Sequence, residues 1–201
     1  MTDSNLRRRI GLFGGTFDPP HRGHLGIAQE ALTGLKLQEV LLVVAGNPYQ
    51  KQDRHITDGH ERLKMVELLV AETAGLSASS IEIERPGPSF TIDTVEALLE
   101  VERGEVQIVL IVGADLAPGI ETWHRASELA ALVEVAVVRR PGVPSPQLPS
   151  HWDGSIFDVE PSSCSSSGIR ADLLEGLDVS NCLSPAVLHH VQTHCLYDGR
   201  Q

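Results

Sequence analysis

The chain holds 201 residues, of which 41% are hydrophobic and 21% are charged, and its formal net charge is −11. This length suits one α/β domain with a proper core, since domains usually hold about 100–200 residues. The acidic balance argues against non-specific attachment to nucleic acid, which depends on many Lys and Arg side chains. No apolar run approaches the roughly 18 residues of a membrane span, and the start lacks a secretory apolar segment. We therefore expect a cytoplasmic protein without a nucleic-acid partner or membrane attachment.

Short β-branched apolar runs alternate along the chain with longer amphipathic stretches. The runs predict strands at Ile10–Phe13, Val40–Ala45, Ile81–Ile83, Val106–Val112 and Val133–Val138. The amphipathic stretches predict helices at Gly23–Leu35, Glu61–Ala74, Thr91–Val101 and Ala126–Leu132. Because strands and helices alternate, the sequence predicts an α/β fold with a doubly wound, Rossmann-like parallel sheet. Ligands then bind at the carboxyl ends of the strands.

The character of the chain changes after residue 140. Prolines crowd residues 141–149 and predict a long loop. One strand and two helices are predicted beyond it, at Ser155–Val159, Ser167–Leu174 and Pro185–His194. We expect a single domain over residues 8–201, with a flexible terminus at residues 1–7 and a C-terminal helical part at about residues 167–197.

Three cysteines, Cys164, Cys182 and Cys195, form no C-x-x-C pair and are odd in number. This pattern fits reduced thiols better than a disulfide framework. We therefore expect three reduced cysteines without a part in function.

The segment Gly14–His24, with the sequence GGTFDPPHRGH, directly follows the first predicted strand and directly precedes an amphipathic helix. Its two initial glycines let the main chain approach a ligand closely, and a helix N-terminus offers N–H groups and a favourable dipole to phosphate. His21 and His24 lie three residues apart, so both rings can donate to the same polyphosphate, with room left by Gly23. Taken alone, H-x-G-H is explained equally well by a turn with two surface histidines.

The whole segment resembles the signature G-G-T-F-D-P-x-H-x-G-H of the H-x-G-H nucleotidyltransferases, and in particular of the bacterial nicotinate-nucleotide adenylyltransferases. Further similarities follow in the order of that family, at Gly87–Thr94, Gly113–Asp115, Trp123, Arg140–Gly142 and Ser165–Arg170. The resemblance extends from Ile10 to Tyr197. It implies the nucleotidyltransferase type of sheet and the transfer of the adenylyl group of ATP to nicotinate mononucleotide, with release of pyrophosphate.

The resemblance also implies a set of site residues. The expected catalytic residues are His21, His24 and Arg170, which stabilise phosphate charge rather than act as nucleophiles. The ATP site is expected to contain these three with Gly14, Gly15, Thr16, Phe17, Gly113, Asp115, Ser166, Ser167 and Ile169. The mononucleotide site is expected to contain Thr16, Asn47, Lys51, Ser89, Phe90, Thr91, Trp123 and Arg140. Mg²⁺ is expected to arrive bound to ATP rather than in a metal site of the protein.

Several alternatives stay open. Ser165–Ser167 and Asp115 could each cap a helix, and Trp123 could be a core residue. The loop Asn47–Lys51 departs from the run that many family members have, which leaves Lys51 without a secure role, and Arg140 could equally be a surface charge.

Other substrates and another class of function also compete with the preferred interpretation. Within the superfamily these are the amide mononucleotide and phosphopantetheine, and outside it a non-catalytic nucleotide-binding sensor. Trp123 and Gly87–Thr94 speak against phosphopantetheine, and the two histidines with Arg170 favour an enzyme. A homo-oligomer remains open.

Near the C-terminus, His189, His190, His194 and Cys195 invite a zinc interpretation, because His190 and His194 are four residues apart. The sequence shows no carboxylate third ligand and no paired Cys/His ligands, so it disfavours such a site.

Overall fold

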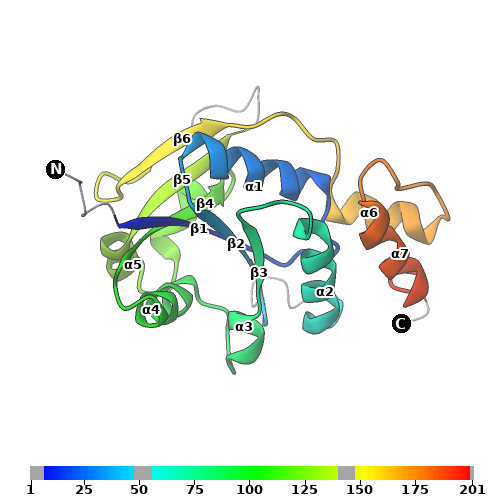
Figure 1. Cartoon of the computed structure of the whole chain (residues 1–201), viewed down its shortest axis with the longest axis horizontal. Coiled ribbons are helices and arrows are strands. Elements are labelled where there is room, and N and C mark those ends of the chain that lie inside the picture. The colour runs from blue at the N-terminus through cyan, green and yellow to red at the C-terminus, as the bar shows by residue number, and fades with distance from the viewer. Residues whose placement is uncertain (1–6, 48–55, 140–147, 200–201) are drawn as a thin grey trace.

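The computed structural model describes residues 7–47, 56–139 and 148–199. Its centre is one parallel sheet with the strand order β3-β2-β1-β4-β5-β6, and helices cover both faces (Figure 1). The strands are β1 (Arg8–Gly15), β2 (Glu39–Val44), β3 (Leu76–Ser79), β4 (Val106–Gly113), β5 (Val133–Arg139) and β6 (Gly154–Asp158). The predicted doubly wound parallel sheet is therefore confirmed.

The described helices are α1 (Arg22–Gly34), α2 (Gly59–Val70), α3 (Ile81–Glu84), α4 (Thr91–Val101), η2 (Ala117–Thr122), α5 (Ala126–Leu132), α6 (Ser166–Leu174) and α7 (Pro185–Thr193). Three of them, α2, α6 and α7, begin at a side-chain cap. Asp58 accepts from the His60 N–H and starts α2, and Ser184 accepts from the Val187 N–H and starts α7. Within the described residues, no helix combines the length and the apolar character needed to cross a membrane.

Two apolar layers hold the helices to the sheet. Along β4, Ile108 and Leu110 belong to the layer under α4 and α5, whereas Val109 and Ile111 belong to the layer under α1 and α2. Because both faces of this strand are covered, it is apolar at every one of these positions, as is typical of a central parallel strand. A third apolar cluster joins α2 to α6 and α7, which lie together beside α2 (Figure 1).

The prediction of a strand at Ile81–Ile83 is wrong. Residues Ile81–Glu84 form one helical turn, in which the N–H groups of Ile83 and Glu84 both donate to the carbonyl of Ser80. The strand at this edge of the sheet, next to β2, is β3. Its sequence Leu-Ser-Ala-Ser carries little β propensity. Pairing with β2 stabilises this strand despite its sequence.

Candidate active site

A pocket of about 360 Å³ opens where β1 and β4 end side by side. The strand order reverses between these two strands, and this is the place where open α/β sheets bind ligands. Many residues expected from the sequence line the pocket, namely Gly14, Gly15, Thr16, Ser89, Thr91, Gly113, Asp115 and Trp123. The pocket therefore combines residues that the sequence assigned to the ATP site and residues that it assigned to the mononucleotide site.

The two glycines after β1 serve different purposes. A Cβ atom on Gly15 would lie 2.8 Å from the ring of Phe17, so this position must be glycine for the ring to pack. A Cβ atom on Gly14 would meet no described atom within 4 Å. Phe17 itself has a left-handed backbone, with φ at 50°, and its ring is buried edge-on against Phe13 and His24. Phe17 thus supports His24 and is not among the residues that line the pocket.

His21 and His24 come together at the start of α1, with ring centroids 3.8 Å apart. The His21 N–H donates to His24 Nδ1 at 3.2 Å. Because Nδ1 is an acceptor, the proton of the neutral His24 ring lies on Nε2, which makes that atom a hydrogen-bond donor. A Cβ on Gly23 would lie 2.8 Å from Ser162 Oγ and 3.0 Å from His21 Nδ1. Gly23 therefore makes room for Ser162 and His21, and the expectation that it also leaves room for polyphosphate stays a prediction.

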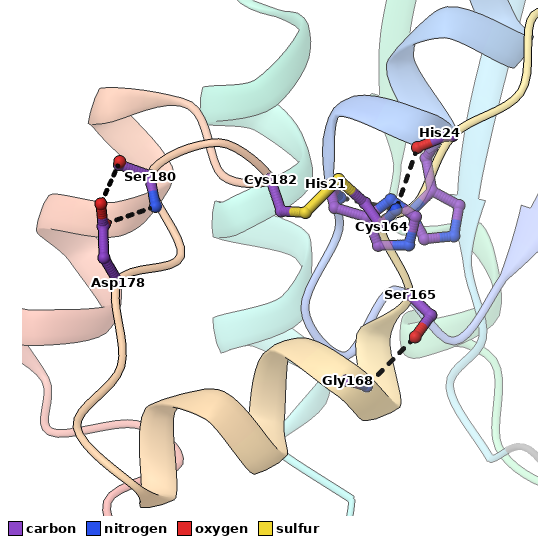
Figure 2. Close-up of a disulfide and its surroundings, with 9 residues drawn as sticks. His21, His24, Cys164, Ser165, Gly168, Asp178, Ser180 and Cys182 are labelled. Atoms are coloured by element: carbon purple, nitrogen blue, oxygen red, sulfur yellow. Dashed lines mark hydrogen bonds between the residues drawn. A yellow bond between two sulfur atoms is a disulfide. The ribbon is translucent and has the colours of Figure 1, made fainter.

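The segment Ser165–Arg170 contacts the signature loop directly. Ser166 Oγ donates to the Pro19 carbonyl at 2.9 Å, and Arg170 Nη1 donates to the Asp18 carbonyl at 2.6 Å. Ser165 caps α6 by accepting from the Gly168 N–H at 3.1 Å (Figure 2). The C-terminal helical part and the H-x-G-H loop are therefore fixed to one another.

The remaining members of this segment lie in different surroundings. Ser167 is exposed in the first turn of α6, whereas Ile169 is buried in the apolar cluster between α2, α6 and α7. The N–H of Ile169 donates to the Ser165 carbonyl at 2.9 Å within the helix. Ile169 therefore anchors α6 by packing.

The expectation of three reduced cysteines is wrong for two of them. Cys164 and Cys182 form a disulfide, with Cα atoms 5.5 Å apart, and Cys195 is an exposed free thiol. Their separation of 18 residues hid the pair, because α6 and the turn after it bring the two ends together. The carbonyl of Cys182 also accepts from the Arg22 N–H at 2.9 Å. The disulfide therefore lies between the start of α1 and the start of α6 (Figure 2).

Reduction of this disulfide is expected to lower the free energy of unfolding by about 3 kcal/mol, because it releases a closed loop of this length in the unfolded chain. Thermal unfolding with and without dithiothreitol, monitored by circular dichroism, measures the effect. The double variant Cys164→Ser/Cys182→Ser is the control, and its melting temperature should not respond to reductant. An unchanged melting temperature of the fully reduced wild type, verified by thiol titration, would contradict the expectation.

On the mononucleotide side, Ser89 joins two segments. Its Oγ accepts from the N–H groups of Gly46 and Asn47, at 3.0 and 3.1 Å, and so ties the end of β2 to the start of α4. The Phe90 ring stacks on His124, with centroids 4.2 Å apart, instead of lining the pocket. Asn47 is exposed at the end of the described segment. Lys51 and Arg140 lie outside the described residues.

Sequence reasoning missed Glu82, which lines the pocket from α3. Glu82 is buried, and its Oε1 accepts from the Thr94 hydroxyl at 2.7 Å. Burial raises the pKa of this carboxyl, although hydrogen bonds from Thr94 and Ser89 oppose the rise. The run Ile81–Ile83 predicts a strand, and no residue pattern marks Glu82 as a pocket residue.

Arg62 and Tyr197 were also missed. Arg62 is buried on the apolar face of α2, and its Nη1 donates to the Thr16 carbonyl at 2.8 Å. Burial lowers the pKa of Arg62, with nearby Asp18 opposing this. Burial raises the pKa of the Tyr197 hydroxyl, which stays protonated and donates to Asp18 Oδ1 at 2.8 Å. A charged residue at core spacing in a predicted helix, as at Arg62, was the signal that could have been used.

Comparison with known proteins agrees with this geometry. The cytidylyltransferase-like family matches residues 12–172. The chain is 36% identical to a probable nicotinate-nucleotide adenylyltransferase of Bacillus pumilus, over 96% of this chain and 100% of that relative. A relative of the same description from Dechloromonas aromatica is 38% identical, over 94% of this chain and 97% of its own length.

A solved structure is similar in fold. The nicotinic acid mononucleotide adenylyltransferase of Plasmodium falciparum, complexed with NaAD, superposes with a TM-score of 0.76 at 17% identity, over 95% of this chain and 98% of that chain. At that identity the likeness concerns the fold. Together with the full-length relatives, it leads to one conclusion: the chain belongs to the cytidylyltransferase-like family and, within it, to the nicotinate-nucleotide adenylyltransferases.

Proposed function

We propose that this chain transfers the adenylyl group of ATP to nicotinate mononucleotide, which yields deamido-NAD and pyrophosphate. The observation that carries the proposal is that one pocket is lined both by the signature loop and by Asp115, Thr91 and Trp123. A phosphate oxygen of the mononucleotide attacks the α-phosphorus of ATP, and the bond from that phosphorus to the bridging oxygen of pyrophosphate breaks. No covalent enzyme intermediate is required, so the protein contributes orientation and charge stabilisation.

We assign the phosphates of ATP to the region next to the pocket where α1 and α6 begin. His24 offers its Nε2–H there, next to His21, and Arg170 lies within hydrogen-bonding distance of the loop that carries them. The N-termini of α1 and α6 add backbone dipoles that favour anions. Ser166 and Arg170 donate hydrogen bonds to residues of the signature loop. These contacts support the proposal that residues 8–201 form one domain.

The adenosine is assigned to the turn after β4. Gly113 and Asp115 line the pocket there, and a Cβ atom on Gly113 would lie 2.5 Å from Asp115 Oδ1. The glycine therefore leaves room for the Asp115 carboxylate to fold back against the main chain.

The mononucleotide is assigned to the side formed by α4 and Trp123. The half-buried Trp123 ring packs on the core under α4 and α5 while it lines the pocket, so one face of the ring can stack on the pyridine. Ser89 and Thr91 line the same region with hydroxyl groups. Lys51 and Arg140 remain proposed partners of the mononucleotide phosphate.

We propose that Mg²⁺ enters the pocket on ATP. The groups assigned to the phosphates are N–H donors, histidines and Arg170, which suit phosphate oxygens rather than a bare cation. Mg²⁺ keeps several waters and prefers phosphate oxygens, and it supplies positive charge to the phosphates when it is bound.

We also propose a cytoplasmic location, because both substrates are charged and would not cross a membrane unaided. A disulfide is uncommon in a reducing cytoplasm. Thiol trapping in intact cells, followed by a mass shift of the peptides that carry Cys164 and Cys182, would report the state of the pair there.

Product analysis tests the proposed activity. The protein is incubated with Mg-ATP and, separately, with nicotinate mononucleotide, nicotinamide mononucleotide or phosphopantetheine, and the products are separated by chromatography. Deamido-NAD and pyrophosphate in equal amounts are the expected result. ATP binding without any new dinucleotide would instead indicate a nucleotide-binding sensor.

Mg-ATP is expected to raise the melting temperature, because a ligand of the folded state stabilises it by about 2.7 kcal/mol at a hundredfold excess over Kd. Arg170→Ala should shrink this ATP-dependent shift, since it removes a fixed positive charge beside the signature loop. The shift is compared within each protein by thermal unfolding. Lys64→Ala is the matched control, since it removes an exposed positive charge on α2. An equal shift in Arg170→Ala and wild type would assign Ser165–Arg170 to helix capping alone.

A further inference from the structure

We propose that Glu61, His190 and His194 form a transition-metal site, best suited to Zn²⁺, that joins α2 to α7. One ligand atom from each residue can be chosen so that all three lie within 4.8 Å of one another. Glu61 Oε2 lies 2.7 Å from His190 Nε2, and the two imidazole centroids are 4.1 Å apart. The carboxylate ligand that the sequence did not reveal therefore comes from another helix.

The packing of the two helices holds these residues together. His190 lies in the last turn of α7 and His194 is its C-cap residue, four positions later, so their rings project from the same face. Glu61 stands in the first turn of α2. Between the helices, Met65 and Val187 are fully buried in the shared apolar cluster. The ligand set is thus fixed by an apolar interface, and a metal would find it largely preformed.

Hydrogen bonding already prepares His194 as a ligand. Its Nδ1 lies 3.0 Å from the carbonyl oxygen of His190, which can only accept a hydrogen bond. Nδ1 therefore carries the proton in the neutral ring, and the lone pair is on Nε2. A backbone carbonyl that orients the distal nitrogen of a ligating histidine is the usual second partner in zinc sites.

The distance between Glu61 and His190 fits a tetrahedral ion after a small adjustment. Zn–N and Zn–O bonds of about 2.0–2.2 Å place tetrahedral ligand atoms about 3.3 Å apart. The present separation of 2.7 Å between Glu61 Oε2 and His190 Nε2 must therefore open by about half an ångström. The Glu61 side chain is 36% exposed and can rotate, whereas that of His190 is only 10% exposed and stays in place. The metal replaces the hydrogen bond between the two groups.

The donor set selects the metal and suggests its effect. Two imidazoles and one carboxylate suit Zn²⁺ better than Mg²⁺, which prefers oxygen ligands. His194 is exposed, so water can fill a fourth position. Glu61 directly precedes Arg62, whose guanidinium holds the carbonyl of Thr16 in the signature loop. Bound metal would therefore fasten α7 to the helix that supports that loop.

Metal titration of the full chain tests the proposal. The titration is done without nucleotide, and reductant is omitted so that the disulfide between Cys164 and Cys182 is kept. Protein freed of metal by a chelator is titrated with Co²⁺ and then with Zn²⁺. We expect one equivalent of Co²⁺ to give the visible absorption bands of four-coordinate cobalt, Zn²⁺ to abolish them, and Zn²⁺ to raise the melting temperature. Glu61→Gln and His194→Ala should each weaken binding by about 100-fold or more.

Three matched variants separate this site from other metal-binding groups. His189→Ala removes an exposed histidine of the same helix, Cys195→Ser removes the free thiol beside His194, and His24→Ala disrupts the other histidine pair. All three should bind Co²⁺ as the wild type does. Wild-type affinity in His194→Ala, or loss of the bands in Cys195→Ser or His24→Ala, would overturn the proposal. Because His194 is exposed, its variant should fold, and circular dichroism verifies this.

Discussion

His24→Ala is expected to lower kcat by about 10²–10³ without unfolding the protein, because it removes a donor directed at charge that develops on the phosphates. The hydrogen bond from the His21 N–H to His24 Nδ1 makes Nε2 the donating atom. His21→Ala should cause a fall of similar size. His21 is only 6% exposed and its ring lies against that of His24, so part of this fall is expected to come from misplacement of His24.

Steady-state rates at saturating Mg-ATP and nicotinate mononucleotide measure both variants. His189→Ala is the control, and a melting curve for each protein shows that it is folded. His24→Gln should recover part of the lost kcat, since its amide can place an N–H near the position of Nε2. Unchanged kcat in both alanine variants would remove the histidines from the mechanism, and a rise in KM alone would limit them to ground-state binding.

Nicotinate mononucleotide is expected to be used in preference to nicotinamide mononucleotide by a factor of tens to thousands in kcat/KM. Both pyridines would stack alike on Trp123, so the substituent must decide. A carboxylate accepts from every donor, whereas an amide brings N–H groups that face the hydroxyl donor of Thr91. Each unpaired polar group in a desolvated site costs about 1–3 kcal/mol. One or two such mismatches give the expected preference.

We expect Glu82 to make this preference dependent on pH. An ionised Glu82 would repel the nicotinate carboxylate, but burial raises the pKa of Glu82 and favours its neutral form, which can donate a hydrogen bond. The neutral form persists to higher pH than in an ordinary glutamate and is lost as the pH rises through the raised pKa. The preference for the acid should therefore fall as the pH rises through this range, and Glu82→Gln, which is neutral throughout, should show a ratio independent of pH.

The ratio of kcat/KM for the two mononucleotides, measured across pH, tests both statements. Titration of the phosphate, which the two substrates share, cancels in this ratio. Trp123→Ala should weaken the use of both substrates and leave much of the ratio intact, because stacking is common to them. Equal wild-type values, or a preference for the amide, would overturn the expected selectivity, and a pH-independent wild-type ratio would remove Glu82 from it.

The sequence by itself determined the features that depend on local pattern. Apolar runs at β1, β2, β4 and β5 mark strands covered on both faces, and the N-terminal proline of α7 marks a helix start. The position of the signature segment between a strand and a helix placed a ligand site at the carboxyl edge of the sheet. The pocket between β1 and β4 lies at this edge.

Only the tertiary structure decided which distant side chains meet. Three pairs illustrate this: Glu61 with His190, Glu82 with Thr94, and Cys164 with Cys182. The members of the first two pairs lie on different elements, and the two cysteines lie before and after α6. No residue pattern encodes such a meeting, because it follows from how apolar layers stack the helices on the sheet. The strand β3 belongs to the same class, since pairing with β2 stabilises a segment of low β propensity. Local periodicity thus fixes the elements, whereas long-range packing fixes the neighbours.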